Sequence, residues 1–212
     1  MKITIFGATG KTGIEVVKRA LEAGHTVTAF VRDPNKMTVK NEALTVTQGD
    51  VTDKASVNKA IEGSEGVVVA LGAAADMQAD VVMAEGTANI IESMKEYGVK
   101  RLTVMSSFGM SGENRGMALL KQFGMDEEQI SAIKPLLEDK KQQTELVRTS
   151  GLDYVVVQPT MLTDTEKTGQ YRAEENLEVK PGDGISRADV ADFLLKSLVD
   201  GKYFGKVIVL SY

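Results

Sequence analysis

Apolar, strand-like segments alternate with amphipathic, helix-like segments along the chain, and this alternation limits the possible folds more than any other feature. Runs of apolar and β-branched residues lie at 3–6, 26–31 and 102–105, and apolar residues recur at helical spacing in 11–23 and 81–94. Strands that are apolar on both faces are typical of a parallel sheet covered by helices on both sides. Because strand–helix–strand connections are right-handed, the pattern predicts an α/β fold with a doubly wound parallel sheet.

The alternation continues to the end of the chain. Further strands are expected at 44–48, 67–71, 154–158 and 207–210. Ser186, with Asp189 three residues later, predicts a capping box at the start of a last helix. The 212 residues contain no internal repeat and no linker, so we expect residues 1–212 to form one domain, with a small C-terminal portion on the substrate side.

Composition excludes several classes of protein. The chain has no cysteine, which excludes disulfides, thiolate zinc sites and cysteine nucleophiles. Its 25 basic and 30 acidic residues give a net charge of −5, unlike the basic footprint of a nucleic-acid-binding protein. No run approaches the roughly 20 apolar residues that span a bilayer, and the start of the chain has no signal-peptide pattern. We therefore expect a cytoplasmic protein that binds neither nucleic acid nor membranes, and, with one histidine and no ligand cluster, no metal site.

A glycine-rich turn with the spacing GxxGxxG joins the first strand to the first helix. Glycines permit a tight turn and let backbone amides approach a diphosphate at the positive end of the helix. The nucleoside triphosphate loop GxxxxGK[ST] is excluded, because Ile5 stands where that motif needs glycine. The turn therefore predicts a dinucleotide site, with these cofactor-contacting residues: Gly7, Thr9, Gly10, Lys11, Thr12 and Gly13.

The end of the second strand indicates which dinucleotide binds. A site for NAD(H) carries an acid there, about 20 residues after the glycines, to bind the ribose hydroxyls. This chain has Arg32 instead, with Lys36 nearby, and a guanidinium pairs well with a 2′-phosphate. We expect NADP(H) to be preferred over NAD(H); Asp33, beside Arg32, leaves open that an acid faces the ribose.

Other strand ends should meet at the same edge of the sheet, since ligands of such folds lie at the carboxyl ends of the strands. Asp50 and Val51 should flank the adenine, and Ser106 and Ser107 should lie beside the nicotinamide. The remaining predicted cofactor contacts after strand ends are Leu71, Gly72, Ala73, Pro159, Thr160 and Met161.

At these residues the chain resembles a known family. Its glycine turn, Val31-Arg32-Asp33, Gly49-Asp50-Val51 and Leu71-Gly72 are similar to those of atypical short-chain dehydrogenases with NmrA-like NAD(P)-binding domains, which implies a Rossmann-type fold. Segments 83–90, 150–154, 168–171 and 185–189 are similar to the biliverdin reductase B / NADPH-flavin reductase branch. That resemblance implies a monomeric oxidoreductase that reduces flavins and, in some members, linear tetrapyrroles. Met161 and Ala74 stand where the branch has histidine and arginine, and both departures count against a tetrapyrrole substrate.

The usual acid of short-chain dehydrogenases, a tyrosine with a lysine four residues later, is missing at all five tyrosines. Alcohol dehydrogenation through that pair is therefore not expected, whereas flavin reduction needs only hydride transfer between two stacked rings, with a proton from water. Ser107, and after it Ser106, are the candidate catalytic residues; the alternative is that both hydroxyls only complete the strand end.

These observations predict an NADPH-dependent oxidoreductase that transfers hydride to a planar acceptor. The acceptor is a flavin (FMN or riboflavin), or a similar conjugated molecule such as biliverdin or a quinone. FMN or another flavin can serve as the substrate, and the alternative of a flavin that stays bound is left open. Two alternatives stay open. One is an NmrA-like redox sensor that binds the dinucleotide without turnover, and the other is an enzyme like the nucleotide-sugar epimerases and dehydratases.

Overall fold

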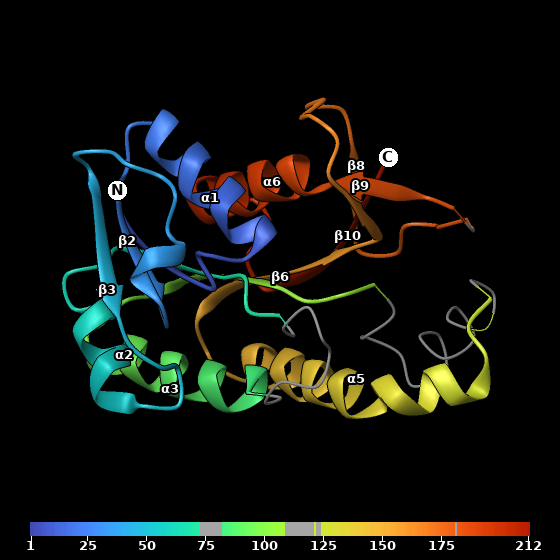
Figure 1. The fold of residues 1–212 in the computed structure, drawn as a ribbon, viewed down its shortest axis with the longest axis horizontal. Coiled ribbons are helices and arrows are strands. Elements are labelled where there is room, and N and C mark those ends of the chain that lie inside the picture. Colours follow the sequence, from blue (N-terminus) through green and yellow to red (C-terminus); the bar gives the residue numbers. More distant parts are fainter. Residues whose placement is uncertain (73–81, 109–120, 122–123, 181) are drawn as a thin grey trace.

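The computed structural model describes residues 1–72, 82–108, 121, 124–180 and 182–212. Its main sheet has eight strands in the order β3-β2-β1-β4-β5-β6-β10-β8 (Figure 1). Their bounds are β1 Lys2–Phe6, β2 Thr26–Val31, β3 Leu44–Gln48, β4 Gly66–Val69, β5 Arg101–Met105, β6 Asp153–Pro159, β8 Arg172–Glu174 and β10 Lys206–Ser211. Neighbours from β3 to β10 pair in parallel, and only β8 runs antiparallel to its neighbour. The predicted doubly wound parallel sheet is confirmed.

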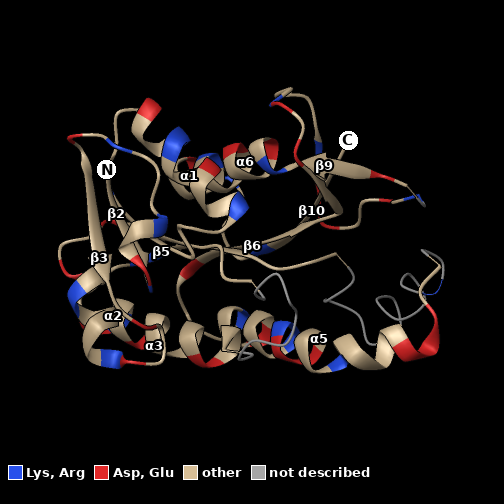
Figure 2. Cartoon of the chain, viewed as in Figure 1, with Lys and Arg blue, Asp and Glu red and all other residues tan. Residues whose placement is uncertain are grey.

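Helices cover both faces of the sheet. Their bounds are α1 Lys11–Glu22, α2 Lys54–Ile61, α3 Met83–Glu96, α5 Glu127–Arg148 and α6 Arg187–Asp200, with a 3₁₀ turn, η1, at Pro34–Lys36. Helices α1 and α6 lie on one face, and α2, α3 and α5 lie on the other (Figure 1). Basic and acidic residues are interspersed on α1, α5 and α6 in the view of Figure 2. No helix among the described residues is long and apolar enough to cross a membrane.

Each central strand buries both of its faces. In β1, Ile5 packs with Val17 of α1 and Leu194 of α6, while the next residue, Phe6, joins the cluster that includes Ile90 of α3. Both strand residues are completely buried. Side chains alternate across a strand, so an all-apolar strand fills two separate cores, one under each helical layer.

The last quarter of the chain adds a small second sheet, in which β7 (Met161–Thr163) pairs in parallel with β9 (Gly184–Ser186). These strands, like β8, were not predicted, because three residues are too few to show a periodic pattern. The irregular stretch expected at 107–124 lies largely outside the described residues.

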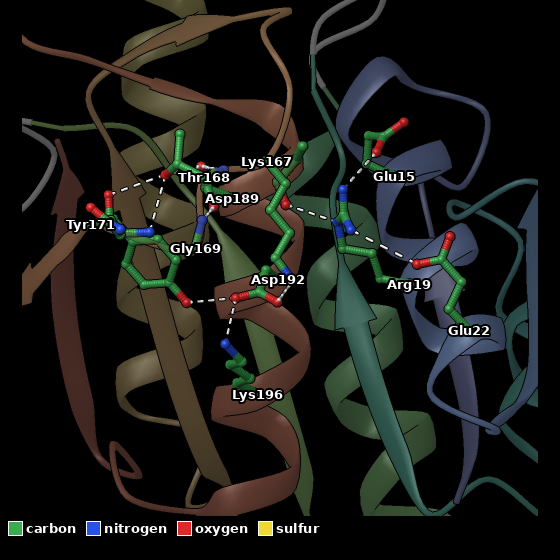
Figure 3. Close-up of polar contacts among 12 residues, drawn as sticks. Glu15, Arg19, Glu22, Lys167, Thr168, Gly169, Tyr171, Asp189, Asp192 and Lys196 are labelled. Carbon is green, nitrogen blue, oxygen red and sulfur yellow. Dashed lines mark hydrogen bonds and ion pairs between the residues drawn. The ribbon is translucent and has the colours of Figure 1, made fainter.

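Asp189, on the first turn of α6, ties this C-terminal portion together. Its carboxylate accepts hydrogen bonds from the backbone N–H groups of Thr168 (2.9 Å) and Gly169 (2.8 Å) and from the hydroxyl of Tyr212 (2.7 Å). One helical turn on, Asp192 binds Lys167 and Lys196 (both 2.7 Å) and the hydroxyl of Tyr171 (2.8 Å; Figure 3). Two carboxylates on one face of α6 therefore hold the loop that precedes β8.

The predicted capping box at α6 is only half formed. The Ser186 hydroxyl accepts from the Asp189 N–H (2.9 Å), as expected of an N-cap. The return bond is absent, because the Ser186 N–H donates to the Tyr212 hydroxyl instead (3.2 Å). The Asp189 carboxylate serves the loop and the C-terminal tyrosine, and that tertiary role could not be inferred from the Ser186–Asp189 spacing.

We predict that Asp189→Asn destabilises the protein most near neutral pH. Burial alone would raise the pKa of Asp189, but hydrogen bonds from Thr168, Tyr212 and Gly169 lower it from 3.8 to about 2. A lowered carboxyl pKa stabilises the fold above about pH 4, and that contribution is lost as the pH falls towards 2. Loss of charge-assisted hydrogen bonds costs about 2 kcal/mol, or roughly 6 °C in melting temperature.

Thermal melts between pH 2 and pH 7 measure this effect, with exposed Asp200, at the other end of α6, changed to Asn as the control. The difference in melting temperature between wild type and Asp189→Asn should become smaller towards pH 2. A difference in melting temperature that stays constant with pH would show that the charge of Asp189 does not stabilise the fold.

Candidate functional site

The loops after β1 and β4 touch at the point where the strand order reverses. Gly7 follows β1 with φ +77°, and a Cβ built on it would lie 2.5 Å from the carbonyl oxygen of Ala70, just after β4. Only glycine adopts this backbone readily and fits this space. In doubly wound sheets, ligands bind in the crevice outside such a reversal, between the two flanking strands.

The start of α1 lies beside this crevice without a capping side chain. Gly10 is the N-cap and makes no side-chain cap bond. A Cβ on Gly13 would lie 2.0 Å from the Gly7 carbonyl oxygen, so the third glycine lets the first turn of the helix pack onto the strand end. The first N–H groups of a helix need acceptors, and a diphosphate supplies them. The predicted turn therefore has the cradle geometry of a dinucleotide site.

Lys11 of this turn reaches across to the C-terminal portion. Its ammonium lies 2.9 Å from the carboxylate of Asp164, which follows β7, and Asp164 also binds Arg187 at the start of α6. The hydrogen bond from Lys11 and the nearby charge of Arg187 lower the pKa of Asp164, whose side chain is exposed. Two cations on two helix starts thus share one solvent-exposed carboxylate next to the cradle.

The end of β2 presents Arg32 to solvent, as the sequence predicts. One carboxylate oxygen of Asp33 accepts hydrogen bonds from the N–H of Asn35 (3.0 Å) and from its side-chain amide (3.1 Å), capping η1. Hydrogen bonds from Thr52 lower the pKa of Asp50, and the charge of Arg32 lowers it further. Asp33 has a local structural role, whereas Arg32 and Lys36 are exposed cations after β2.

Helix α3 holds the loop that we expect to flank adenine. The Asn89 side chain donates to the carbonyl of Val51 (2.9 Å). A Cβ on Gly86 would lie 2.6 Å from the Val51 side chain, so the loop packs directly on the helix backbone. Val51 is buried whereas Asp50 is exposed, which leaves Asp50 as the side chain of this pair that a ligand can reach.

Lys140 of α5 is a functional candidate that the sequence reasoning missed. Its ammonium is buried at the carboxyl edge, 3.4 Å from the carbonyl oxygen of Leu71 after β4 and 3.3 Å from that of Met105 at the end of β5. An ammonium has three N–H donors. Two carbonyls occupy two of them, so among the described residues one donor is left for a ligand.

The environment of Lys140 changes its proton affinity. Burial lowers the pKa of its ammonium to about 8, and the adjacent carboxylate of Asp139 opposes that fall. A strongly shifted lysine in a crevice is a functional candidate on physical grounds. The sequence did contain a signal, because Lys140, Thr144 and Val147 recur at helical spacing on the buried face of α5.

The two predicted catalytic serines differ in their surroundings. Ser106 is buried, and its hydroxyl lies 3.0 Å from that of Thr144, which donates to the carbonyl of Lys140. Ser107 is half-buried, and among the described residues its hydroxyl has no hydrogen-bond partner. Among the described residues, Ser107 is therefore the serine whose hydroxyl makes no hydrogen bond, while Ser106 fastens β5 to α5.

The residues after β6 border the same edge. The Pro159 carbonyl accepts a hydrogen bond from the N–H of Phe108 (3.1 Å), so the segments after β5 and β6 are in contact. Thr160 is buried, with its hydroxyl 3.1 Å from that of Ser211, whereas Met161 is 55% exposed. The hydroxyl of Thr160 thus serves the fold. Ala73 lies outside the described residues, and Gly72, beside it, is exposed.

The described residues fit a nicotinamide dinucleotide. The glycine turn leaves room for a diphosphate at the start of α1, Arg32 is an exposed cation after β2, and Lys140 is a buried donor near the ends of β4 and β5. No group of three or more His, Cys, Asp or Glu side chains that could hold a metal ion occurs among them.

Comparison with known proteins agrees with this geometry. A sequence model of a family described as NAD(P)H-binding matches residues 7–201. An uncharacterized chloroplastic protein of Arabidopsis thaliana is 27% identical, over 98% of this chain and 75% of that protein. Phenylcoumaran benzylic ether reductase IRL1 of Ginkgo biloba is 27% identical, over 99% of this chain and 68% of that enzyme.

The fold also matches solved structures. The anaerobilin reductase ChuY of Escherichia coli superimposes with a TM-score of 0.80 at 22% identity, over 99% of this chain and 96% of that one. At this identity the similarity establishes the fold. The family match confirms the expectation of an NAD(P)H-binding domain.

We predict that Arg32→Gln weakens NADPH binding about tenfold and leaves NADH binding unchanged, because only NADPH carries the 2′-phosphate that the guanidinium would bind. Fluorescence titration with both dinucleotides measures this without an acceptor. Lys36→Gln, at an exposed cation in η1 four residues after Arg32, is the matched control. Tighter binding of NADH than of NADPH by the unmodified protein would contradict the role of Arg32.

Proposed function

Because this chain belongs to the NAD(P)H-binding family, we propose that it is an NADPH-dependent reductase that acts, as a monomer, on a flavin such as FMN or riboflavin or on a similar conjugated acceptor such as biliverdin or a quinone. Its fold is of the kind that reductases use, and a reductase from Ginkgo biloba is similar over 99% of this chain. The preference for NADPH, the class of acceptor and the monomeric state are the parts that we add.

The observation that carries the proposal is the buried ammonium of Lys140 beside the glycine cradle. Ala70 contacts the Gly7 turn, and the next residue, Leu71, gives its carbonyl to Lys140. One strand end thus joins the diphosphate cradle to a buried donor. A fold alone does not require a lysine at this place, since moving a charge out of water is costly.

The bound cofactor would supply a hydride, and the protein has to hold it and its acceptor in contact. The N-terminus of α1 would bind the diphosphate, and Arg32 the 2′-phosphate. The remaining N–H of Lys140 would bind a ribose hydroxyl and so fix the position of the nicotinamide. Ser107, whose hydroxyl has no partner among the described residues, would orient the acceptor.

The chain offers no phenol to act as a proton donor in the manner of alcohol dehydrogenases. The residue four positions before Lys140 is Leu136, where that arrangement needs tyrosine. A flavin takes a hydride without such a donor, because its proton can come from water. The same observation favours a second candidate, a redox sensor that binds NADPH without turnover.

Consumption of NADPH with FMN, riboflavin, biliverdin and a quinone, followed by absorbance, separates the two candidates. Steady turnover with any of these acceptors supports the reductase. Tight NADPH binding in a calorimetric titration, without turnover on any of the four, contradicts it and favours the sensor.

We predict that Lys140→Met lowers kcat/KM about a hundredfold without lowering the melting temperature. Methionine fills the space of the lysine stem and removes a buried charge, so the fold is preserved. Because the pKa of Lys140 is about 8, the ammonium is present below that pH, and the activity of the wild type should fall above it. Lys141→Met, at the exposed neighbouring position, is the control. Full activity of Lys140→Met would exclude the lysine from the site.

We predict that Ser107→Ala lowers turnover about tenfold and leaves NADPH affinity unchanged, because its hydroxyl faces the acceptor rather than the cofactor. Ser106→Ala provides the contrast. Its hydroxyl is buried against Thr144, so this variant should lower stability instead. Steady-state kinetics and thermal melts of both variants test the assignment. Unchanged turnover of Ser107→Ala would leave both serines with a purely structural role.

A further inference from the structure

Helix α3 begins without a cap of its own. Its N-cap residue is Val82, which makes no side-chain cap bond. A carboxylate from another helix takes that place: one oxygen of Asp139 accepts from the N–H of Met83 (2.9 Å) and the other from the N–H of Ala84 (3.1 Å). Both hydrogen bonds are buried. Each carboxylate oxygen thus satisfies one of the N–H groups that a helix start leaves free.

Asp139 is the residue immediately before Lys140, and the charge of its carboxylate raises the pKa of the buried ammonium against the effect of burial. Asp139 is 9% exposed and Lys140 7% exposed. A buried carboxylate is stabilised by backbone N–H donors and by the positive end of a helix dipole, and α3 supplies both. In turn, a buried ammonium needs a negative charge near it.

The surroundings of Lys140 offer no other counter-charge among the described residues. On α3, the acidic residue of the first turn, Glu85, is exposed. The ends of β4 and β5 face the ammonium with the carbonyls of Leu71 and Met105. On α5 itself, neighbouring Glu138 and Lys141 are exposed, and the acid of β6, Asp153, begins that strand at the opposite edge.

We propose that Asp139 is a positioning residue for Lys140. Its carboxylate fastens α5 to the start of α3 and so holds the lysine at the carboxyl edge. It also supplies the negative charge that keeps the buried ammonium in its charged form. The inference deepens the proposed function, and it rests on that function only for the effect on catalysis.

The carboxylate has two effects that different substitutions separate. Asp139→Asn keeps the shape but removes the charge and one of the two acceptors. Asp139→Glu keeps the charge but has a longer arm that fits the two N–H groups less well. Glu138→Gln, at the exposed preceding position, is the matched control.

The main measurement follows the protonation of Lys140 directly. In ¹⁵N-lysine-labelled protein, the NMR signal of its side-chain nitrogen reports the protonation midpoint without any substrate, and Lys140→Met assigns the signal. The wild-type midpoint should lie near pH 8, because burial lowers the pKa of Lys140 and Asp139 opposes the fall. Asp139→Asn should shift the midpoint about one pH unit lower. Asp139→Glu and Glu138→Gln should keep it near the wild-type value.

Hydrogen exchange of the Met83 and Ala84 amides tests whether the Asp139 carboxylate fastens α5 to the start of α3. Both amides should exchange about tenfold faster in Asp139→Asn, because one acceptor is lost, and also faster in Asp139→Glu, but not in Glu138→Gln. Unchanged exchange in both Asp139 variants would show that the carboxylate does not hold α3 in solution and would overturn the proposal.

An unchanged Lys140 midpoint in Asp139→Asn would also overturn the proposal, whatever the enzyme does. If the midpoint falls but the alkaline limb of the activity profile does not follow it, the inference about Asp139 holds and the proposed role of Lys140 in the reaction fails. If Asp139→Asn does not fold, Asp139→Glu provides the test of the charge effect. An unchanged Lys140 protonation midpoint in Asp139→Glu supports the charge effect, and a lower midpoint contradicts it.

Discussion

The contact between the turn after β1 and the end of β4 determines how the site is built. With φ +77° at Gly7 and the Ala70 carbonyl 2.5 Å from any Cβ placed there, the two strand ends meet only because the turn carries no side chain. Gly13, in the first turn of α1, likewise has no room for a side chain, because a Cβ there would lie 2.0 Å from the Gly7 carbonyl oxygen. Together they bring the uncapped start of α1 to the crevice where the strand order reverses, so a diphosphate cradle follows from a packing requirement.

Much of the fold could be predicted from the sequence, because the central strands are buried on both faces. Residues 26–31 and 44–48 form strands with the expected bounds, and Asp53 caps α2 as its position suggests. Strands β7, β8 and β9 were missed, because each has three residues and pairs with a partner far along the chain. The loop before β8 and the C-terminal tyrosine meet at Asp189 of α6, and these contacts are tertiary.

The site was predicted well at the backbone level and less well at the side-chain level. Strand ends could be assigned to the edge of the sheet, but not the directions of their hydroxyls. Alternation along β5 carries part of that information: Leu102 and Val104 face the core beneath α3, and Ser106, two residues on, points to Thr144 of α5. Because neighbouring side chains point to opposite faces of a strand, the same alternation predicts that Ser106 faces α5 and that Ser107 does not.

Lys140 escaped prediction for a different physical reason. Glu138, Asp139, Lys140 and Lys141 form a charged run, and such runs normally lie in water. Here two of the four are buried, because Asp139 accepts hydrogen bonds from the start of α3 and Lys140 donates to two carbonyls after β4 and β5. The sequence shows the charges but not the partners, which come from elements about 35 to 70 residues away.

The energetic cost of burying Asp139 and Lys140 supports a functional interpretation of the two residues. Moving an ammonium out of water costs several kcal/mol, and replacing buried ions by apolar residues of similar volume is often neutral or stabilising. The neighbouring part of α5 already packs against the core through Val147, so an apolar residue at position 140 would meet the needs of the fold. Two long carbonyl contacts, at 3.3 and 3.4 Å, offset this cost only partly. A buried charge that the fold does not need, next in sequence to a carboxylate that caps a neighbouring helix, supports the proposal that a ligand binds it.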